Sequence, residues 1–284
     1  MIRVQHVIIG ASGQVGGYLQ RTLARLGEDV RGTYYRHPEP SLTQLDITEP
    51  KEVQDFFNAL KRVDVVWIPA AMANVDQCQQ DVDASHLHNV EAPGYVAQTA
   101  MKRGGRVVFF STDYVFDGHN GPYGEEDPTH PIQVYGQHKE EIEQYLRKEI
   151  PHSLIIRPAW IYSRDENPRN FVYRVLEQLK ENKPVKAVID QWNTPTPSEG
   201  LVKMAWQAVQ DGFEGILHIA GPERLTRYDL TCRIAKAFGY DVSLIEPVNT
   251  ASFHLPASRP LNGGLITQYA PYKMESGRDF TPVF

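Results

Sequence analysis

The chain of 284 residues has few cysteines, no long apolar run and no block of like charge. Its two cysteines, Cys78 and Cys232, have neither the spacing of a zinc or redox site nor the density of a disulfide framework, so we expect free thiols. Nowhere do about 18 apolar residues follow one another, and the apolar stretch Val7–Ile9 is too short for a signal-peptide core. These absences predict a cytoplasmic protein without a membrane span.

The charge balance and the spacing of the histidines argue against a nucleic-acid-binding protein and against a metal-dependent enzyme. Lys and Arg number 29 against 35 Asp and Glu, and no basic cluster is present, so the chain lacks the electrostatic footprint of a nucleic-acid-binding protein. The ten histidines show no metal-ligand spacing, which predicts no catalytic metal. The length and the hydrophobic content of 41% are sufficient for one large or two modest domains.

The first half of the chain alternates short β-branched runs with longer segments of helical apolar spacing, which is typical of βαβ units. Right-handed crossovers between such units produce a doubly wound parallel sheet, the Rossmann architecture. The expected strands are 6–9, 30–35, 63–68, 106–111 and 153–157, and the expected helices are 14–26, 50–60, 83–103 and 135–148.

Beyond Pro158 the pattern loosens and predicts a smaller C-terminal α/β cap. Helices are expected at 170–181, 199–210 and 227–238, with strands at 185–189 and 216–219. The proline-bearing stretches Thr194–Pro197 and Leu255–Pro260 are expected to be loops over a site. We therefore assign residues 1–160 to a dinucleotide-binding domain, joined by part of 185–215, and 161–284 mainly to the cap.

A glycine-rich turn follows the first expected strand and opens the first helix. Gly10, Gly13 and Gly16 form a GxxGxxG pattern, in which backbone N–H groups and the helix dipole can hold a pyrophosphate. The alternative is a turn needed only for close packing of strand and helix. Its position at the first strand-to-helix junction favours a dinucleotide.

The end of the second strand bears on the choice of dinucleotide. It carries Arg36 and no carboxylate for a ribose 2′-hydroxyl, which favours NADPH over NADH, although a solvated surface arginine is the alternative. Asp46 either accepts a hydrogen bond from the adenine amino group or begins the turn before Pro50.

Tyr135 and Lys139 lie four residues apart, which places a phenol and an ammonium on one face of the expected helix. In a second copy of this spacing, Tyr269 and Lys273, the tyrosine is followed by Ala270-Pro271, which disfavours a helix there. A lysine beside a tyrosine is expected to lower the pKa of the phenol and allow proton exchange with a substrate oxygen. The hydroxyls of Ser111 and Thr112, at the end of the fourth strand, can bind the same oxygen, which predicts carbonyl reduction.

These residues give the chain a family resemblance over nearly its whole length. The block STDYVFDG at 111–118, then Tyr135-Gly136-x-x-Lys139, RPAWIY at 157–162, DQWNTPT at 190–196 and Arg259-Pro260 resemble the extended short-chain dehydrogenases/reductases, in particular the dTDP-4-dehydrorhamnose reductases. The resemblance implies a substrate-binding role for the cap, a nucleotide-sugar substrate and a homodimer.

The resemblance also implies roles for individual residues. Catalysis would fall to Thr112, Tyr135, Lys139 and Asn89, the last associated with the proton relay. The cofactor would contact Gly10, Ser12, Gly13, Gln14, Val15, Arg36, Asp46, Ile47, Ala70, Ala71, Tyr135 and Lys139. The substrate would contact Val75, Tyr114, Trp160 and Arg259.

Three residues differ from the patterns of related proteins. Tyr114 stands where the related dehydratases have a glutamate, so a simple reductase is favoured. Ala73 lacks a hydroxyl that the family directs at the hexose, and His138 replaces a common serine; as a lone helix histidine, His138 is expected to be a surface or packed residue.

The predicted reaction is reduction of the C4 carbonyl of a nucleotide-linked 4-keto-6-deoxyhexose, as in dTDP-rhamnose biosynthesis, with NADPH as cofactor and NADH as the alternative. The rival reading is an NADP-binding regulatory subunit resembling the β subunit of methionine adenosyltransferase, without turnover. A dinucleotide sensor that has lost the sugar site is a third.

Overall fold

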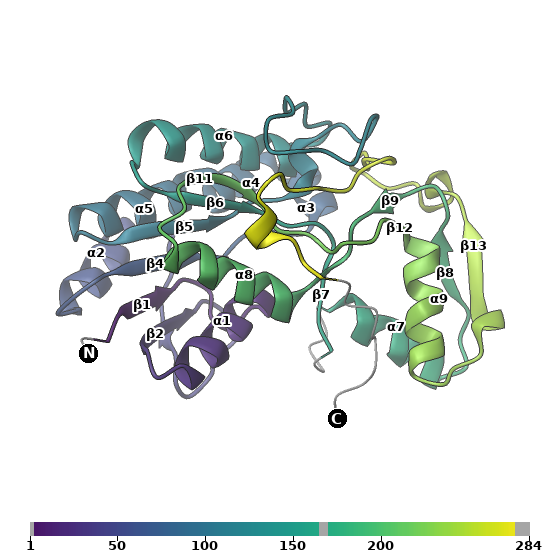
Figure 1. Cartoon of the computed structure of the whole chain (residues 1–284), viewed down its shortest axis with the longest axis horizontal. Helices are drawn as coiled ribbons and strands as arrows, with labels where there is room; N and C mark the ends of the chain where they lie inside the picture. Colours follow the sequence, from purple (N-terminus) through teal and green to yellow (C-terminus); the bar gives the residue numbers. More distant parts are fainter. Residues whose placement is uncertain (1–2, 165–169, 276–284) are drawn as a thin grey trace.

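The computed structural model describes residues 3–164 and 170–275. Seven parallel strands form its main sheet in the order β11-β6-β5-β4-β1-β2-β3 (Figure 1), which confirms the doubly wound architecture. The strands are β1 (Gln5–Ile8), β2 (Asp29–Tyr34), β3 (Thr43–Gln44), β4 (Val65–Ile68), β5 (Arg106–Phe110), β6 (Leu154–Arg157) and β11 (Gly215–His218).

Helices cover both faces of this sheet because its strands are apolar on both sides. On one face, α1 (Gln14–Arg25) and α8 (Ser198–Gln210) share a core with Ile8, Trp67 and Phe110. On the other, α2 (Pro50–Ala59), α5 (Ala92–Lys102) and α6 (Val134–Glu149) pack against Ile9 and Phe109. All strands are parallel, so their carboxyl ends meet at one edge, where ligands of open α/β sheets bind.

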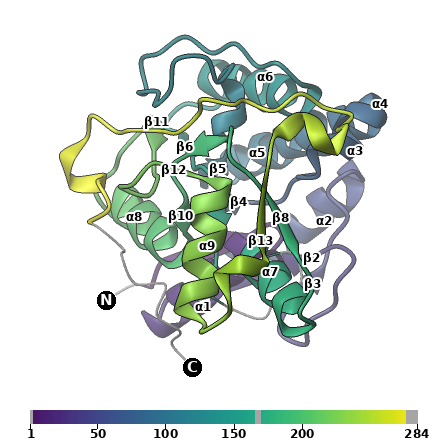
Figure 2. The same ribbon diagram turned by 90° about the vertical axis from the view of Figure 1, so that its right-hand side faces the viewer.

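The cap has a separate apolar core beyond this edge (Figure 2). Helices α7 (Phe171–Lys180) and α9 (Arg227–Ala237) pack against the parallel strands β8 (Val185–Val188) and β13 (Ile245–Val248). Two short pairs join the cap to the sheet region: β7 (Ile161–Tyr162) with β10 (Thr196–Pro197), and β9 (Trp192–Asn193) with β12 (Leu225–Thr226).

The structure corrects four sequence expectations. Strand 216–219 was grouped with the cap, but β11 pairs with β6 in the main sheet, a contact between segments about sixty residues apart. The stretch Thr194–Pro197 was expected to be a loop, but its last two residues pair as β10; because β10 lies beside only one strand, Pro197 removes no central ladder bond.

The two other corrections concern helices. The expected helix 83–103 is divided into α4 (Val82–His86), a π-helical turn (Leu87–Glu91) and α5. Pro93, which lacks a backbone donor, follows the turn and removes one regular helical bond. Helix α3 (Val75–Gln80), which starts at an Asn74 cap, was missed because six residues give too little periodicity.

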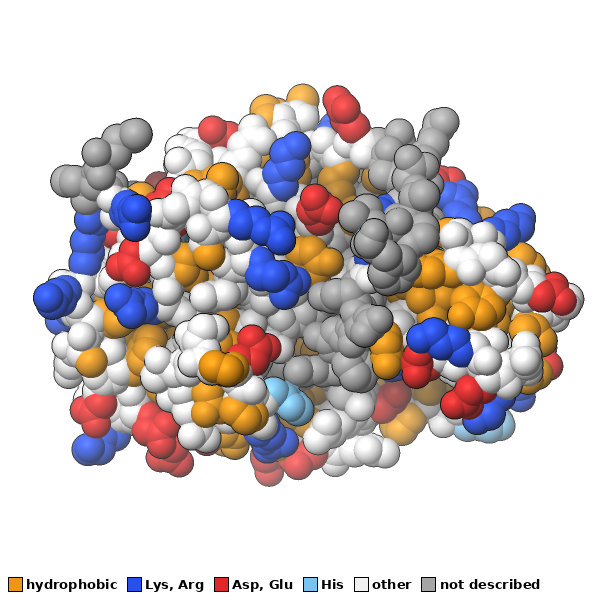
Figure 3. Space-filling model, turned by 90° about the horizontal axis from the view of Figure 1, so that it is seen from below, with side chains coloured by type: hydrophobic (Ala, Val, Ile, Leu, Met, Phe, Trp, Pro, Cys, Tyr) orange, Lys and Arg blue, Asp and Glu red, His pale blue; other side chains and the backbone are white. Residues whose placement is uncertain are grey.

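The surface seen from below carries Lys, Arg, Asp and Glu side chains interspersed with one another (Figure 3). Among the described residues, no helix is long and apolar enough to cross a membrane. Both cysteines are free, and the described part of the chain contains no group of three metal-ligating side chains.

Candidate active site

The glycine loop brings the start of α1 against the carboxyl end of β1. A Cβ added to Gly16 would lie 2.2 Å from the carbonyl oxygen of Gly10, so only glycine permits this close approach. Gly10 itself has φ +87° and approaches Ala70, where an added Cβ would lie 3.0 Å from the Ala70 Cβ. The close packing proposed as the alternative role is therefore present.

The same loop also fits an anionic ligand. Gly13 caps α1 without a side-chain hydrogen bond, and the first turn of the helix contains no acidic residue. The first-turn N–H groups and the positive end of the helix dipole therefore face the sheet edge, which suits a pyrophosphate. Gln14, the first residue of α1, donates its side-chain amide to Ser198 Oγ over 3.2 Å.

The residues expected around the adenosine lie beside this loop. Arg36 is exposed in the turn after β2, with its guanidinium 4.9 Å from the centre of the Tyr35 ring. Asp46 accepts hydrogen bonds from the backbone N and Oγ1 of Thr48, so the turn-forming reading of this residue is realised. Ile47 packs against the core beneath the sheet, and Ala71 is exposed after β4.

Helix α6 brings Tyr135 and Lys139 to the same sheet edge. Gln133 caps the helix by accepting a hydrogen bond from Gly136 N. A Cβ on Gly136 would lie 2.1 Å from the Tyr114 carbonyl oxygen, so glycine here lets the helix approach the turn after β5. Tyr135 then meets Tyr114 edge-on, with ring centroids 6.2 Å apart. The predicted helical context of the first Tyr–Lys copy is confirmed.

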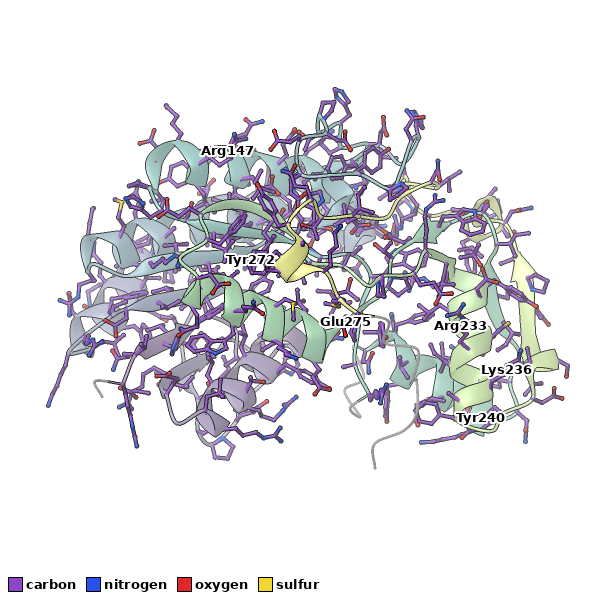
Figure 4. The ribbon with its side chains drawn as sticks, viewed as in Figure 1. Arg147, Arg233, Lys236, Tyr240, Tyr272 and Glu275 are labelled. Atoms are coloured by element: carbon purple, nitrogen blue, oxygen red, sulfur yellow. The ribbon has the colours of Figure 1, made fainter. Side chains whose placement is uncertain are left out.

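The second copy lies elsewhere and is not α-helical. Tyr269 precedes a short 3-10 turn, Ala270–Tyr272, in the C-terminal segment that crosses near α8 (Figure 4). Tyr272 in that turn donates its hydroxyl to Asp211 at the end of α8, over 3.0 Å. This segment therefore fastens the C-terminal chain to the outside of the sheet domain.

The pKa of Tyr135 is shifted in the direction opposite to the sequence expectation. Burial raises the pKa of Tyr135 above that of a free phenol, while hydrogen bonding to Thr112 opposes this. Burial lowers the pKa of Lys139 to about 7, against the opposing charge of Glu143. Lys139 Nζ donates to the Phe110 carbonyl over 2.9 Å and lies 6.0 Å from the Tyr135 ring centre. In this dry site, desolvation is the largest cause of both pKa shifts.

Two hydroxyls at the end of β5 face this region. Thr112 is buried, and its Oγ1 accepts a hydrogen bond from Tyr114 N over 3.2 Å. Ser111 is also buried, and its Oγ has no hydrogen-bond partner among the described residues. An orphaned hydroxyl at the ligand-binding edge of a parallel sheet suits a polar ligand atom.

Asn89 lies on the π-helical turn and makes structural contacts. Its side chain bonds both the N and the carbonyl oxygen of Met72, over 3.0 and 3.1 Å, and donates to Ser85 Oγ over 3.2 Å. Ser85 in turn meets His138 Nδ1 over 2.8 Å, so His138 is a packed, buried residue. The hydrogen bond between Asn89 and Ser85 joins residues four positions apart. That spacing was the available sequence signal, and the sequence analysis did not use it.

Two of the expected substrate residues lie beside Tyr135, and the other two lie in segments nearer the cap. Val75 packs with Tyr114 against Tyr135, so these two lie beside the phenol. Arg259 forms an ion pair with Asp76 at 2.6 Å, which ties the segment after β13 to α3. Asp76 was not identified from the sequence because the short helix that carries it was not recognised.

Trp160 lies between the sheet and the cap, and its backbone has φ 36°. A tryptophan in the left-handed region is strained, and Trp160 is held there by a hydrogen bond from Thr196 N to its carbonyl oxygen. The guanidinium of Arg227, at the start of α9, lies 3.5 Å from the centre of its ring. Nothing in the sequence distinguished Arg227 from other arginines of the cap.

A groove of about 800 Å³ lies at the opposite, amino-terminal ends of β1 and β2, and Arg3, Glu28 and Arg62 are among its lining residues. None of the expected site residues lines it. In a parallel sheet the strand carboxyl ends and helix N-termini provide the ligand-binding groups, so we place the active site at the Tyr135 edge.

A parallel sheet with a glycine loop at its first crossover, and with Tyr135 and Lys139 at its carboxyl edge beneath a cap, defines the class of the extended short-chain dehydrogenases/reductases. Residues 4–276 match the family model described as the RmlD substrate binding domain, so the chain belongs to this family.

Similar proteins carry reductase names. The chain is 34% identical to a probable dTDP-4,6-dihydroxy-2-methyloxan-3-one 4-ketoreductase of Streptomyces antibioticus, over 89% of this chain and 84% of that protein. It is 31% identical to a dTDP-4-dehydrorhamnose reductase of Salmonella typhimurium, covering 92% and 89% of the two chains. The solved dTDP-4-dehydrorhamnose reductase of Bacillus anthracis in complex with NADP has a TM-score of 0.88 and 26% identity, covering 98% and 96%. These names support a reductase over the regulatory subunit.

Proposed function

We propose that this chain reduces the C4 carbonyl of a nucleotide-linked 4-keto-6-deoxyhexose with NADPH. The observation that carries the proposal is the placement of Tyr135, Thr112 and Lys139 at one sheet edge beside the glycine loop, in a chain of the RmlD family. The cofactor supplies the hydride when bound. The residues of this chain bind it, orient the sugar, exclude water and supply the proton.

Tyr135 is the proton donor in this proposal. A phenol whose pKa is raised by burial stays protonated at neutral pH, which is the form that reduction requires. The hydroxyl of Thr112, next to the phenol, orients the carbonyl oxygen, and Val75 and Tyr114 pack around the hexose. Trp160 and Arg259 would bound the substrate on the cap side.

Lys139 holds the ribose of the cofactor in this proposal. Its ammonium is kept at the edge by the Phe110 carbonyl and has further donors available for a ribose hydroxyl. Asn89 fixes Met72 in the segment after β4, and we propose that it positions that segment rather than carrying the proton itself.

The cofactor would extend from Lys139 across the glycine loop. Gly10, Ser12, Gly13, Gln14 and Val15 would hold the pyrophosphate against the start of α1, in agreement with its uncapped first turn. Asp46 and Ile47 would contact the adenine, Arg36 the 2′-phosphate, and Ala70 and Ala71 the nicotinamide-side ribose. We further propose a cytoplasmic location and a homodimer.

The test is loss of NADPH absorbance with dTDP-, GDP- and UDP-linked 4-keto-6-deoxyhexoses, against a reaction without sugar. Turnover by the natural chain and none by Tyr135→Phe is the expected result. Tyr269→Phe is the matched control, because it removes the same hydroxyl from the copy of the motif outside the site. Tight NADPH binding without turnover of any sugar would instead favour a regulatory or sensing protein.

A further inference from the structure

A buried network of polar side chains lies between α6 and the elements that follow β4. Helices α3 and α4 and the π-helical turn between α4 and α5 pack against α6 (Figures 1 and 2). Cys78, Ser85 and Asn89 on these elements are fully buried, and His138 on α6 is 7% exposed. Buried polar groups are held in place by hydrogen bonds, so the partners of each side chain show what the network fixes.

The inner end of this network holds the backbone of Met72, shortly after the end of β4. Asn89 Oδ1 accepts a hydrogen bond from Met72 N over 3.0 Å, and Asn89 Nδ2 donates to the Met72 carbonyl oxygen over 3.1 Å. Cys78 Sγ donates to the same carbonyl oxygen over 3.1 Å. The side chain of Met72 packs against the cluster of Cys78 and Tyr135. The place of Met72 beside the phenol therefore depends on the orientation of the Asn89 amide.

Ser85 and His138 fix that orientation. Asn89 Nδ2 donates a hydrogen bond to Ser85 Oγ over 3.2 Å, so the Ser85 oxygen is an acceptor toward the amide. The hydrogen of the Ser85 hydroxyl is then directed to His138 Nδ1, 2.8 Å away. This order of donors requires a neutral histidine with its proton on Nε2, and burial favours that form by lowering the pKa of His138.

Tyr135 lies between two links that join α6 to the same elements. Val134, the preceding residue, donates its backbone N–H to Gln79 Oε1 on α3 over 3.2 Å. His138, one turn later on α6, is bonded to Ser85 on α4. The helix that carries the phenol is therefore cross-linked, on both sides of Tyr135, to the segment that holds Met72.

The outer side of His138 is closed by a second histidine. The ring of His86 meets the ring of His138 edge-on, with centroids 5.2 Å apart. His86 is itself held by Glu91 and Glu141, over 3.0 and 3.1 Å. His138 is consequently fixed from the surface side as well as from the Ser85 side, and its Nδ1 is presented inward.

We propose that His138 is a positioning residue of the active site, which fixes the Asn89 amide through Ser85 and thereby holds Met72 against Tyr135. Without the Nδ1 acceptor, the Ser85 hydroxyl turns to another partner and the amide loses a fixed neighbour. Met72 directly follows the segment proposed to face the cofactor ribose, and a small misplacement beside the proton donor lowers kcat. The effect on turnover rests on the proposed function, whereas the hold on Met72 can be measured without a substrate.

The first test is hydrogen–deuterium exchange of the Met72 amide, followed by NMR. We expect exchange about 10-fold faster in His138→Ala and in Ser85→Ala, because the acceptor of Met72 N is loosened. His138→Asn should restore slow exchange, because its Oδ1 is an acceptor as many bonds from the backbone as Nδ1. His119→Ala is the matched control, since the His119 side chain is 75% exposed. The amides of β1 report global destabilisation and should not change.

The second test is a double-mutant cycle on turnover of the nucleotide sugar. We expect His138→Ala and Ser85→Ala each to lower kcat about 10-fold, with His138→Asn close to the natural chain. The double variant should also lose about 10-fold rather than about 100-fold, because both changes remove the same link. A purely structural role would lower stability and leave the kcat of the folded protein unchanged.

The outcomes separate this proposal from the proposed function. Unchanged Met72 exchange in His138→Ala, or effects of the two alanine changes that multiply, overturns the role of His138. If the natural chain reduces a nucleotide sugar and His138→Ala keeps its kcat, the inference fails and the proposed function stands. If Met72 exchange depends on His138 but the natural chain reduces no sugar, the proposed function fails and the hold on Met72 stands.

Discussion

Lys139 is a buried amine whose replacement should stabilise the protein while removing its activity. Its side chain is 1% exposed, and burial lowers its pKa from the ordinary 10.5 to about 7. The folded state therefore disfavours the ammonium form relative to the unfolded chain. Active-site groups of this kind are retained at a cost in stability.

The size of the effect follows from the two pKa values. Each pH unit between them corresponds to about 1.4 kcal/mol, so the span from 10.5 to about 7 gives a destabilisation of about 5 kcal/mol. Removing the amine also leaves the Phe110 carbonyl without its donor, which costs about 1 to 3 kcal/mol. Lys139→Met should therefore raise the free energy of unfolding by about 2 to 4 kcal/mol at neutral pH.

The direction of the Lys139 pKa shift determines how the stability difference between the two chains changes with pH. The folded-state pKa of this cation lies below its unfolded value, so the unfolded chain binds more protons between about pH 7 and 10.5. The destabilisation is complete below about pH 7 and decreases as the pH rises through this window. The advantage of Lys139→Met should consequently shrink by about 3 kcal/mol between pH 7 and about pH 9.5.

The assay is urea unfolding followed by far-UV circular dichroism at both pH values, together with NADPH-dependent turnover. Lys148→Met is the matched control, because Lys148 lies on the same helix with its side chain 81% exposed. A methionine variant less stable than the natural chain at pH 7, or a stability difference independent of pH, would refute the reasoning.

Four other changes test separate parts of the structure. Tyr135→Phe should abolish turnover and spare NADPH binding, as measured by cofactor fluorescence; residual reduction would remove Tyr135 as proton donor. Arg36→Ala should raise the Kd of NADPH more than that of NADH, and an equal loss would contradict a 2′-phosphate contact. Gly16→Ala should lower Tm and NADPH affinity, because its Cβ would lie 2.2 Å from a backbone oxygen; an unchanged Tm would show that the loop relaxes. Glu143→Gln should lower the free energy of unfolding in urea by roughly 3 to 5 kcal/mol, because buried Arg157 loses its charged partner. An unchanged free energy of unfolding would show that the ion pair makes no net contribution.

Local patterns in the chain were sufficient for the architecture of the sheet and for the main candidates of the site. Apolar runs such as Val65–Ile68 predict buried strands because both faces of a parallel sheet are covered. The glycines at 10 and 16 predict a tight strand-to-helix turn because only glycine permits the close approach that is observed. The spacing of Tyr135 and Lys139 predicts a shared helix face because an α-helix repeats every 3.6 residues.

The electrostatics and the long-range pairings follow from the packing of the whole chain. The pKa of Lys139 depends on how completely Phe109, Phe110 and Tyr135 exclude water, and spacing along the chain contains no measure of desolvation. The contact of Arg227 with Trp160 joins residues 67 positions apart, and no local propensity specifies it. Local sequence patterns identify which side chains could react, because periodicity is a local property. The fold decided which of them lie together and in what charge state, because burial is a property of the whole packed chain.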